Sequence, residues 1–214
     1  MSKITATNED NMLMMARYPD NYFELSIVDP PYGIGADKAQ NSGGEKFGYK
    51  KYKNTDWDSK TPSNEYFNEL KRVSKNQVIW GGNYMTEYLK PSMGWILWDK
   101  GQREFSLADG ELAWTSFNKA LRIFGMPRGT ALADANKTGG KIHPTQKPVK
   151  LYEWILMNYA KEGDKIVDTY RGSASLDIAC HNLNFDLVTC EIDTDYFNDG
   201  NKRLKQHQNQ LKMF

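Results

Sequence analysis

The stretch KIVDTYRGSASLDIACHNLNFDLVTCEID, residues 165–193, decides the fold class of this chain. An apolar run ends at Asp168, a turn of small residues surrounds Gly172, a helical pattern follows, and the next apolar run ends at Glu191. Strand, turn, helix and strand in this order form the repeating unit of a parallel sheet covered by helices. The stretch therefore predicts an α/β fold.

The same stretch has the form of a ligand-binding turn. In Rossmann-like units small turn residues let a ligand approach the backbone, and an acid about 20 residues further on accepts hydrogen bonds from ribose hydroxyls. Glu191 stands at that distance from Gly172. The G-x-G-x-x-G pattern of nicotinamide sites is absent, and an ordinary strand-turn-helix unit without a ligand also fits a turn with one glycine.

The alternation of strands and helices continues through most of the chain. Strands are expected at residues 23–28, 76–83, 94–100, 111–117, 120–124, 164–168 and 186–192, and helices at 61–75, 147–161, 173–183 and 194–208. The apolar pattern fades over residues 125–141, where a loop or a small inserted lobe is expected. We predict a mostly parallel twisted sheet with helices on both faces, in a single domain over residues 1–214.

The composition fits a folded chain that acts in the cytoplasm. Of the 214 residues 39% are hydrophobic and 13% aromatic, which argues against disorder. No apolar run approaches the ~20 residues that cross a bilayer, and the first residues form no signal-peptide core. Cys180 and Cys190 are expected to be reduced thiols rather than zinc ligands, and His143, His181 and His207 are too scattered to indicate a metal site.

Positive charge is concentrated in two places although the net charge is only +1. Residues 46–53 contain four lysines and no acid. Residues 117–150 contain one acid, Asp134, against the basic residues Lys119, Arg122, Arg128, Lys137, Lys141, Lys147 and Lys150. Such clusters suit a phosphate backbone, and each also fits a solvated face.

The stretch FELSIVDPPYGIG, residues 23–35, indicates a second site. A buried strand ends at Asp29, and Pro30, Pro31 and Tyr32 follow at once. Two prolines fix φ, so that the acid, the carbonyl groups and the aromatic ring are held in one arrangement. An ordinary strand-ending turn is the alternative for this tetrapeptide taken alone.

The two stretches together are far more specific. Asp-Pro-Pro-Tyr after one strand and Asp-x-x-x-Gly-Ser-x-Ser after another resemble the S-adenosylmethionine-dependent DNA amino-methyltransferases. HPTQKPVKLYEWIL at 143–156 and QVIWGGNY at 77–84 match further segments of that family. The order, catalytic motif first and cofactor turn last, is similar to the circularly permuted β class. The closest resemblance is to short adenine-specific enzymes of phages and prophages, over nearly the whole chain.

The resemblance implies methyl transfer to the exocyclic amino group of a base in double-stranded DNA, after the base has left the helix. Asp29 and the carbonyl group of Pro30 would accept hydrogen bonds from the amino group and stabilise the charge that develops on it. Pro31 completes the rigid turn, and Tyr32 would stack on the base.

The resemblance also implies where S-adenosylmethionine binds. Asp168 would lie near the methionine amino group and Glu191 would hold the ribose. The other expected contacts in the glycine turn are Tyr170, Gly172, Ser173 and Ser175.

Three further residues are expected at the cofactor. Thr145 and Lys147 match the segment that meets the methionine end, where the lysine could pair with the carboxylate of the ligand. Asp10 would reach the adenine of the cofactor, or is a surface turn acid. His143 fits a structural role as well as a contact, and we expect no acid-base role for it.

The turn departs from its relatives at two positions. Ala174 stands where many have glycine, so this turn either keeps a common conformation or carries backbone strain. Arg171 is bulky and charged, and could instead face a phosphate. Both residues put the affinity for the cofactor in doubt.

Two segments are expected to contact DNA. The mobile loop 33–61 mixes lysines with aromatic residues and would close over the base, and the insertion 118–142 would recognise the target. Because the insertion is short, we expect a brief recognition site that a second subunit or another partner extends, as in a homodimer. A restriction endonuclease partner cannot be inferred from the sequence.

Three alternatives stay open beside adenine-N6 methylation. A cytosine-N4 enzyme shares nearly all of the geometry, although Asp rather than Ser before the prolines favours adenine. A catalytically silent DNA-binding subunit or regulator is suggested by Ala174 and Arg171. An RNA or protein amine methyltransferase is disfavoured by the motif order and by the histidine-proline segment.

Overall fold

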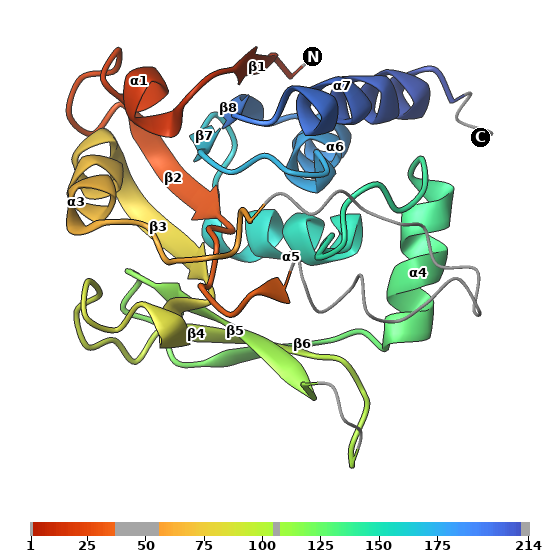
Figure 1. The fold of residues 1–214 in the computed structure, drawn as a ribbon, viewed down its shortest axis with the longest axis horizontal. Helices are drawn as coiled ribbons and strands as arrows, with labels where there is room; N and C mark the ends of the chain where they lie inside the picture. Colours follow the sequence, from red (N-terminus) through yellow and green to blue (C-terminus); the bar gives the residue numbers. More distant parts are fainter. Residues whose placement is uncertain (1, 37–55, 105–107, 211–214) are drawn as a thin grey trace.

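A single eight-stranded sheet organises the chain in the computed structural model, which describes residues 2–36, 56–104 and 108–210 (Figure 1). The strands lie in the order β1-β8-β7-β2-β3-β5-β4-β6. Their bounds are β1 Ile4–Asn8, β2 Phe23–Val28, β3 Ser74–Trp80, β4 Trp95–Asp99, β5 Gly110–Thr115, β6 Arg122–Gly125, β7 Lys165–Asp168 and β8 Asp186–Glu191.

The sheet is mostly parallel, as predicted. The run from β1 through β8, β7 and β2 to β3 is parallel throughout, and β4 and β6 are parallel to each other. Only β5 runs against its neighbours β3 and β4. The carboxyl ends of the parallel strands therefore meet at one edge of the sheet, and the amino end of β5 lies at that same edge.

Helices cover both faces of the sheet, also as predicted. They are α1 Asn11–Met15, α3 Asn64–Val73, α4 Arg128–Lys137, α5 Val149–Tyr159, α6 Ser175–Leu183 and α7 Thr194–Gln208, with the 3-10 turn η2 at Gly82–Tyr84. One face packs against α1 and α3, and the opposite face packs against α5 and α6. Along β3, Ile79 joins the first core while Val78 and Trp80 join the second, which is the alternation of a strand buried on both faces.

Most predicted elements are confirmed, with differences in a few places. Helix α4 occupies Arg128–Lys137, within the region 125–141 where a loop or a small inserted lobe was expected. The strand β1 and the helix α1 near the amino end were not predicted. Helix α5 begins at Val149 with Pro148 as its N-cap, two residues after the predicted start.

The predicted loop 33–61 is only partly described. Residues 33–36 and 56–61 belong to the described part of the chain, and the lysine-rich centre at 46–53 lies outside it. Among the helices of the described residues, none is long and apolar enough to cross a membrane.

Candidate active site at the carboxyl edge of the sheet

Both sequence motifs lie at the carboxyl edge of the sheet. Asp29 follows β2 directly, Asp168 is the last residue of β7, and Glu191 is the last residue of β8. Because β2 pairs with β7 and β7 with β8, all in parallel, the three acids leave neighbouring strands at the same edge. The Asp-Pro-Pro-Tyr turn and the glycine turn are therefore neighbours in space. In open α/β sheets, ligands bind at this edge.

The Asp29 carboxylate is held by two groups in what we call the catalytic corner, Asp29–Tyr32. Tyr32 Oη donates a hydrogen bond to Asp29 Oδ1 at 2.8 Å, and Lys147 Nζ lies 2.5 Å from Oδ2. The same Nζ is 3.1 Å from Tyr32 Oη. Burial raises the pKa of Asp29, an effect that Lys147 and Tyr32 oppose. The corner is therefore a preorganised carboxylate next to an aromatic ring.

Lys147 also contacts a second acid that the sequence did not reveal. Glu111 Oε2 lies 3.2 Å from Lys147 Nζ, and Glu111 Oε1 lies 2.6 Å from Lys100 Nζ. Burial alone would raise the pKa of Glu111, but Lys147 and Lys100 lower it to about 2. Burial would lower the pKa of Lys147, but Asp29 and Glu111 raise it. We call this chain of alternating charges, from Asp29 through Lys147 and Glu111 to Lys100, the charge relay.

The ring of Tyr32 fits against the glycines that follow β3. A Cβ atom on Gly81, where φ is +68°, would lie 2.2 Å from the nearest ring atom of Tyr32. The ring also stacks on Tyr84 of η2, with 5.3 Å between centroids and 17° between planes. The segment QVIWGGNY thus supplies the close approach that the Tyr32 ring needs.

Asp58 fixes the backbone after the catalytic corner. Its Oδ1 accepts hydrogen bonds from the backbone N–H groups of Tyr32 (2.6 Å) and Gly33 (2.9 Å), and Oδ2 accepts one from Ala36 (2.8 Å). Asp58 is 1% exposed. One buried carboxylate therefore joins both described ends of the loop 33–61 to Tyr32.

Asp168 is a buried carboxylate that has no cationic partner in the part of the chain that the structure describes. It is 3% exposed and accepts a hydrogen bond from Tyr170 N at 2.9 Å. Within the described residues no lysine or arginine forms a salt bridge with it. Burial raises its pKa well above the usual range, and the nearby acids Asp177, Asp29 and Glu191 add to this. A ligand with a positively charged amino group would stabilise the ionised form of this carboxylate.

Glu191 lies directly against the glycine turn. Its Oε2 accepts a hydrogen bond from Gly172 N at 2.8 Å and its Oε1 accepts one from Asp193 N at 3.0 Å. A Cβ on Gly172 would meet only Tyr170 O, at 3.9 Å, so the space above the turn is open. Acid and turn are thus joined, with lone pairs of Glu191 left for hydroxyl donors.

The two serines of the turn face inward. Ser173 and Ser175 are 7% and 2% exposed, and their hydroxyl oxygens lie 3.1 Å apart. Arg203 of α7 donates to Ser173 O at 2.6 Å and to Ser175 Oγ at 2.9 Å, and donates to Thr138 O after α4 at 2.8 Å. The two serines therefore stabilise the turn through buried contacts.

Ala174 has a strained backbone conformation, which was one of the two alternatives predicted for this turn. Its φ is +59° and its ψ is +29°, the left-handed region that alanine disfavours. It is fully buried, and a Cβ on Gly200 would lie 3.3 Å from its methyl group. The turn keeps its shape at a conformational cost.

Arg171 does not face a phosphate, and that expectation is corrected. The side chain is buried against Asp177, with Nε and Nη2 each 2.9 Å from Oδ2, and Nη1 donates to Phe197 O at 3.2 Å. Since both charged side chains are fully buried, Arg171 braces α6 against α7 and leaves the face of the turn clear.

The remaining predicted residues lie at different places along the edge. Asp10 is the N-cap of α1, with Oδ1 accepting from Met12 N at 2.8 Å. Thr145 Oγ1 is 3.1 Å from His143 Nδ1. Burial lowers the pKa of His143 to about 3, with help from Lys147, so the imidazole is neutral near pH 7. Lys147 contacts the catalytic corner, as described above.

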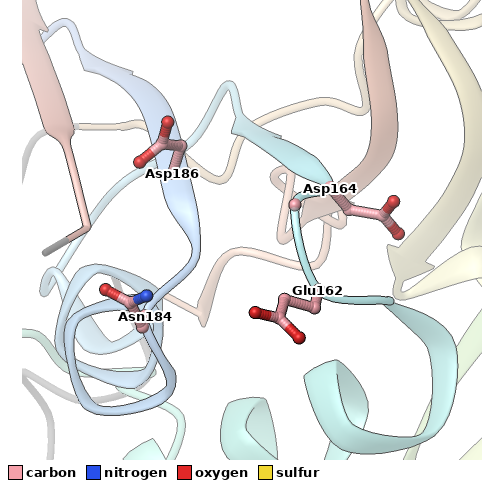
Figure 2. Close-up of a pocket in the computed structure, with 5 residues that line it drawn as sticks. Glu162, Asp164, Asn184 and Asp186 are labelled. Carbon is pink, nitrogen blue, oxygen red and sulfur yellow. The ribbon is translucent and has the colours of Figure 1, made fainter.

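A second group of acids lies at the opposite, amino edge of the sheet. Figure 2 shows the side chains around this small open pocket, of about 210 Å³, which is lined by Glu162, Gly163, Asp164, Asn184 and Asp186. Asp164 accepts a hydrogen bond from Lys161 N and Asp186 accepts one from Lys3 N. Asp164 and Asp186 thus accept backbone hydrogen bonds near strand starts, and no residue of the two predicted motifs lines this pocket.

Comparisons with known proteins find DNA methyltransferases similar to this chain. Residues 127–202 match the N6_N4_Mtase family, described as DNA methylase. The type II methyltransferase M.HpaI of Haemophilus parainfluenzae is 27% identical over 231 residues, which cover 89% of this chain and 70% of that protein. M2.DpnII of Streptococcus pneumoniae is 23% identical over 249 residues, 95% and 90% of the two chains.

Solved structures share the fold. The complex of M1.HpyAVI with SAM aligns with a TM-score of 0.58 at 20% identity, over 94% of this chain and 99% of the other. The cytosine-N4-specific PvuII DNA methyltransferase aligns with a TM-score of 0.62 at 13% identity, over 98% and 91%. These comparisons show a Rossmann-like methyltransferase fold, and the chain is similar to DNA methyltransferases over most of its length.

Sequence reasoning missed three groups that shape the site. Glu111 and Lys100 stand at the ends of neighbouring antiparallel strands, and Asp58 lies in a segment without periodicity. A carboxylate at the start of an antiparallel strand reaches the same edge as one at the end of a parallel strand, and this is the signal that could have identified Glu111.

Proposed function

We propose that the protein is a site-specific DNA methyltransferase that transfers a methyl group from S-adenosylmethionine to the N6 amino group of adenine. The observation that carries the proposal is the shared edge: the catalytic corner and the glycine turn leave the neighbouring strands β2 and β7. A base and a methyl donor bound at these two places would therefore meet.

The catalytic corner fits an exocyclic amino group as the acceptor of the methyl group. The nitrogen of this amino group is a poor nucleophile because its lone pair is delocalised into the ring of the base. The Asp29 carboxylate and the carbonyl group of Pro30 would accept the two amino hydrogens, favour a pyramidal nitrogen and stabilise its developing positive charge. Pro30 and Pro31 fix this backbone, and Tyr32 offers its ring to the extruded base.

The glycine turn fits S-adenosylmethionine, which supplies an activated methyl group on a sulfonium. Asp168, a buried carboxylate with no cationic partner among the described residues, would accept the amino group of the methionine part, and Glu191 would hold the ribose hydroxyls. Gly172 leaves room for the ligand above the turn. Tyr170, Ser173 and Ser175 would shape the wall beneath, with Asp10 and Thr145 further along the same edge.

The class of methyltransferase, the target-recognition region and the second subunit are proposed on the basis of the sequence. The order of the motifs supports a circularly permuted β-class enzyme of the phage and prophage type. The basic region 118–142, which contains β6 and α4, would recognise the target sequence in double-stranded DNA. A second subunit would extend the footprint, and a nuclease-protection assay combined with sedimentation would test this.

Cytosine-N4 is the alternative acceptor, since the PvuII enzyme has the same fold. Expression in a methylation-deficient bacterium, followed by mass spectrometry of the nucleosides and genome-wide mapping of modified bases, tests both. N6-methyladenine at a defined sequence supports the proposal. N4-methylcytosine would redirect it, and the absence of both contradicts it.

A silent DNA-binding subunit is less well supported, because its two motivating residues leave the face of the turn open. Arg171 is turned inward and Ala174 keeps the turn in shape. Calorimetric titration with S-adenosylhomocysteine separates the readings, since a silent subunit would give no heat.

A further inference from the structure

The charge relay holds one ammonium group between two carboxylates. Lys147 Nζ lies 2.5 Å from Asp29 Oδ2 and 3.2 Å from Glu111 Oε2. The Lys147 side chain is 1% exposed and its Nζ lies over the Trp80 ring, 5.0 Å from the centroid. This ammonium group is therefore confined to the space between the two acids.

The proposed function sets a demand that Lys147 alone would oppose. Asp29 has to stabilise positive charge on the amino nitrogen, and a lysine in direct contact neutralises Asp29 and repels that charge. Asp29 and Lys147 together are neutral. Glu111 places a second negative charge 3.2 Å from Lys147, and Lys100, 2.6 Å from Glu111, makes the four groups of the charge relay neutral as a whole. The negative charge that a developing cation requires is therefore available at Asp29 only when Glu111 holds Lys147.

Resting on the proposed function, we propose that Glu111 is a positioning residue that shares Lys147 with Asp29 and takes over this ammonium group when the amino group of the target base binds Asp29. No bond is made or broken in this step. Lys147 shifts toward Glu111, and the Oδ2 atom of Asp29 becomes available to the base.

The other groups near Asp29 do not supply this negative charge. Tyr32 donates its hydroxyl hydrogen to Asp29, and burial raises the pKa of Tyr152 on α5 far above neutrality. Burial also raises the pKa of Asp168 on β7, and the proposed cofactor amino group would neutralise that acid. Lys100 is a cation at the far end of the relay.

The test compares single-turnover methylation by three variants across pH. For Glu111→Gln we expect a rate about tenfold lower at neutral pH, with S-adenosylhomocysteine affinity changed by less than about twofold. The acid limb of its pH profile moves down by about half a pH unit, because loss of a nearby negative charge lowers the pKa of Asp29. Glu111→Asp keeps the charge, and its acid limb stays with that of the parent.

Lys100→Met gives the opposite sign. Removing this cation raises the pKa of Asp29, so the acid limb moves to higher pH while Glu111 keeps its hold on Lys147. A matched control is Glu153→Gln, which removes a largely buried acid from α5 that pairs with Lys150 and Asn182, away from the corner. Its acid limb stays in place.

The outcomes are distinct. One outcome is that Glu111→Gln and Glu153→Gln lower the methylation rate and the melting temperature to the same extent, and that neither shifts the acid limb of the pH profile. Glu111 would then have only a structural role, and the inference would be wrong. The same holds if Lys100→Met and Glu111→Gln shift in one direction, or if Glu111→Gln keeps the full rate. A parent chain that neither methylates DNA nor binds S-adenosylhomocysteine would contradict the proposed function itself.

Discussion

The two edges of the sheet carry similar acids in very different surroundings. The carboxyl edge has Asp29, Asp168 and Glu191, and the amino edge has Glu162, Asp164 and Asp186. At the carboxyl edge the acids are partly or wholly buried, contact a buried lysine or a glycine turn, and have raised pKa values. At the amino edge Glu162 and Asp186 are exposed, and Asp164 and Asp186 accept hydrogen bonds from backbone N–H groups near strand starts.

The difference shows that burial and partners, rather than the presence of acids, mark a site. An exposed carboxylate is already satisfied by water, whereas a buried one is stable only with donors or cations. Perturbed acids in a cleft are candidates for function for this reason. Three of the predictions below change an acid of the candidate site and use an acid at the amino edge as control, and the fourth changes Ala174 of the glycine turn.

The largest effect is expected for Asp29→Ala. Because it removes the acceptor for the amino group, single-turnover methylation falls by about a thousandfold or more, while S-adenosylhomocysteine binding stays within about twofold. Rapid-quench assays and calorimetry measure the two quantities. Asp164→Ala at the amino edge retains the parent rate. Retained turnover in Asp29→Ala would remove Asp29 from the proposed chemistry.

Asp58→Asn is expected to lower the rate by about tenfold or more, because the new amide NH₂ group opposes backbone donors and shifts Tyr32. The melting temperature falls by only a few degrees, and the affinity for S-adenosylhomocysteine is kept. Asp164→Asn also alters an acceptor of a backbone N–H group and serves as the matched control. Equal rates for both variants would show that the backbone after Tyr32 needs no such anchor.

Asp168→Asn is expected to weaken binding of the ligand and to stabilise the fold of the apo protein. We expect S-adenosylhomocysteine to bind about tenfold more weakly, since a charged hydrogen bond is lost, and the apo protein to melt at a higher temperature near pH 7. The pKa of Asp168 is raised by burial, so its destabilising charge appears as pH rises above the pKa of the unfolded chain.

The gain in melting temperature should therefore fade as the pH is lowered through the folded pKa of Asp168. Melting curves at several pH values measure it, and Asp186→Asn at the exposed amino edge is the control. A gain that persisted in acid would assign the effect to packing rather than to charge.

The smallest effect is expected for Ala174→Gly. Relief of the left-handed strain is offset by loss of a buried methyl group and by the greater freedom of glycine in the unfolded chain, so the free energy of unfolding changes by less than about 1 kcal/mol. Binding of S-adenosylhomocysteine changes by less than about twofold. A strong gain in affinity would mean that Ala174 holds the turn in an unfavourable shape.

The sequence predicted the parts of the molecule that depend on local pattern. Apolar runs that end in turn residues located β2, β7 and β8, and two motifs on adjacent strands located the edge where the site lies. The strand β1 was missed because it is short, has only Ile4 and Ala6 as apolar residues, and buries none of its residues fully.

Other parts depend on contacts far apart in the chain. The helix α4 buries only Asp134 and Ala135, so its sequence shows no apolar stripe, and Asp134 ties it to α5 by accepting from Val149 N. The inward orientation of Arg171 could not be predicted, because its bulk and charge gave no indication of a buried ion pair with Asp177. The contact of Lys147 with Glu111 joins separate parts of the chain and leaves no local signature.

The reversed direction of β5 has a consequence for how such an enzyme can vary. Lys100 and Glu111 flank the turn of one hairpin, because β4 and β5 pair from Asp99 opposite Gly110. Their separation is thus set by the register of this strand pair and not by either diagnostic motif. A change in that register would alter the electric field at the proposed acceptor nitrogen while every signature residue stays the same.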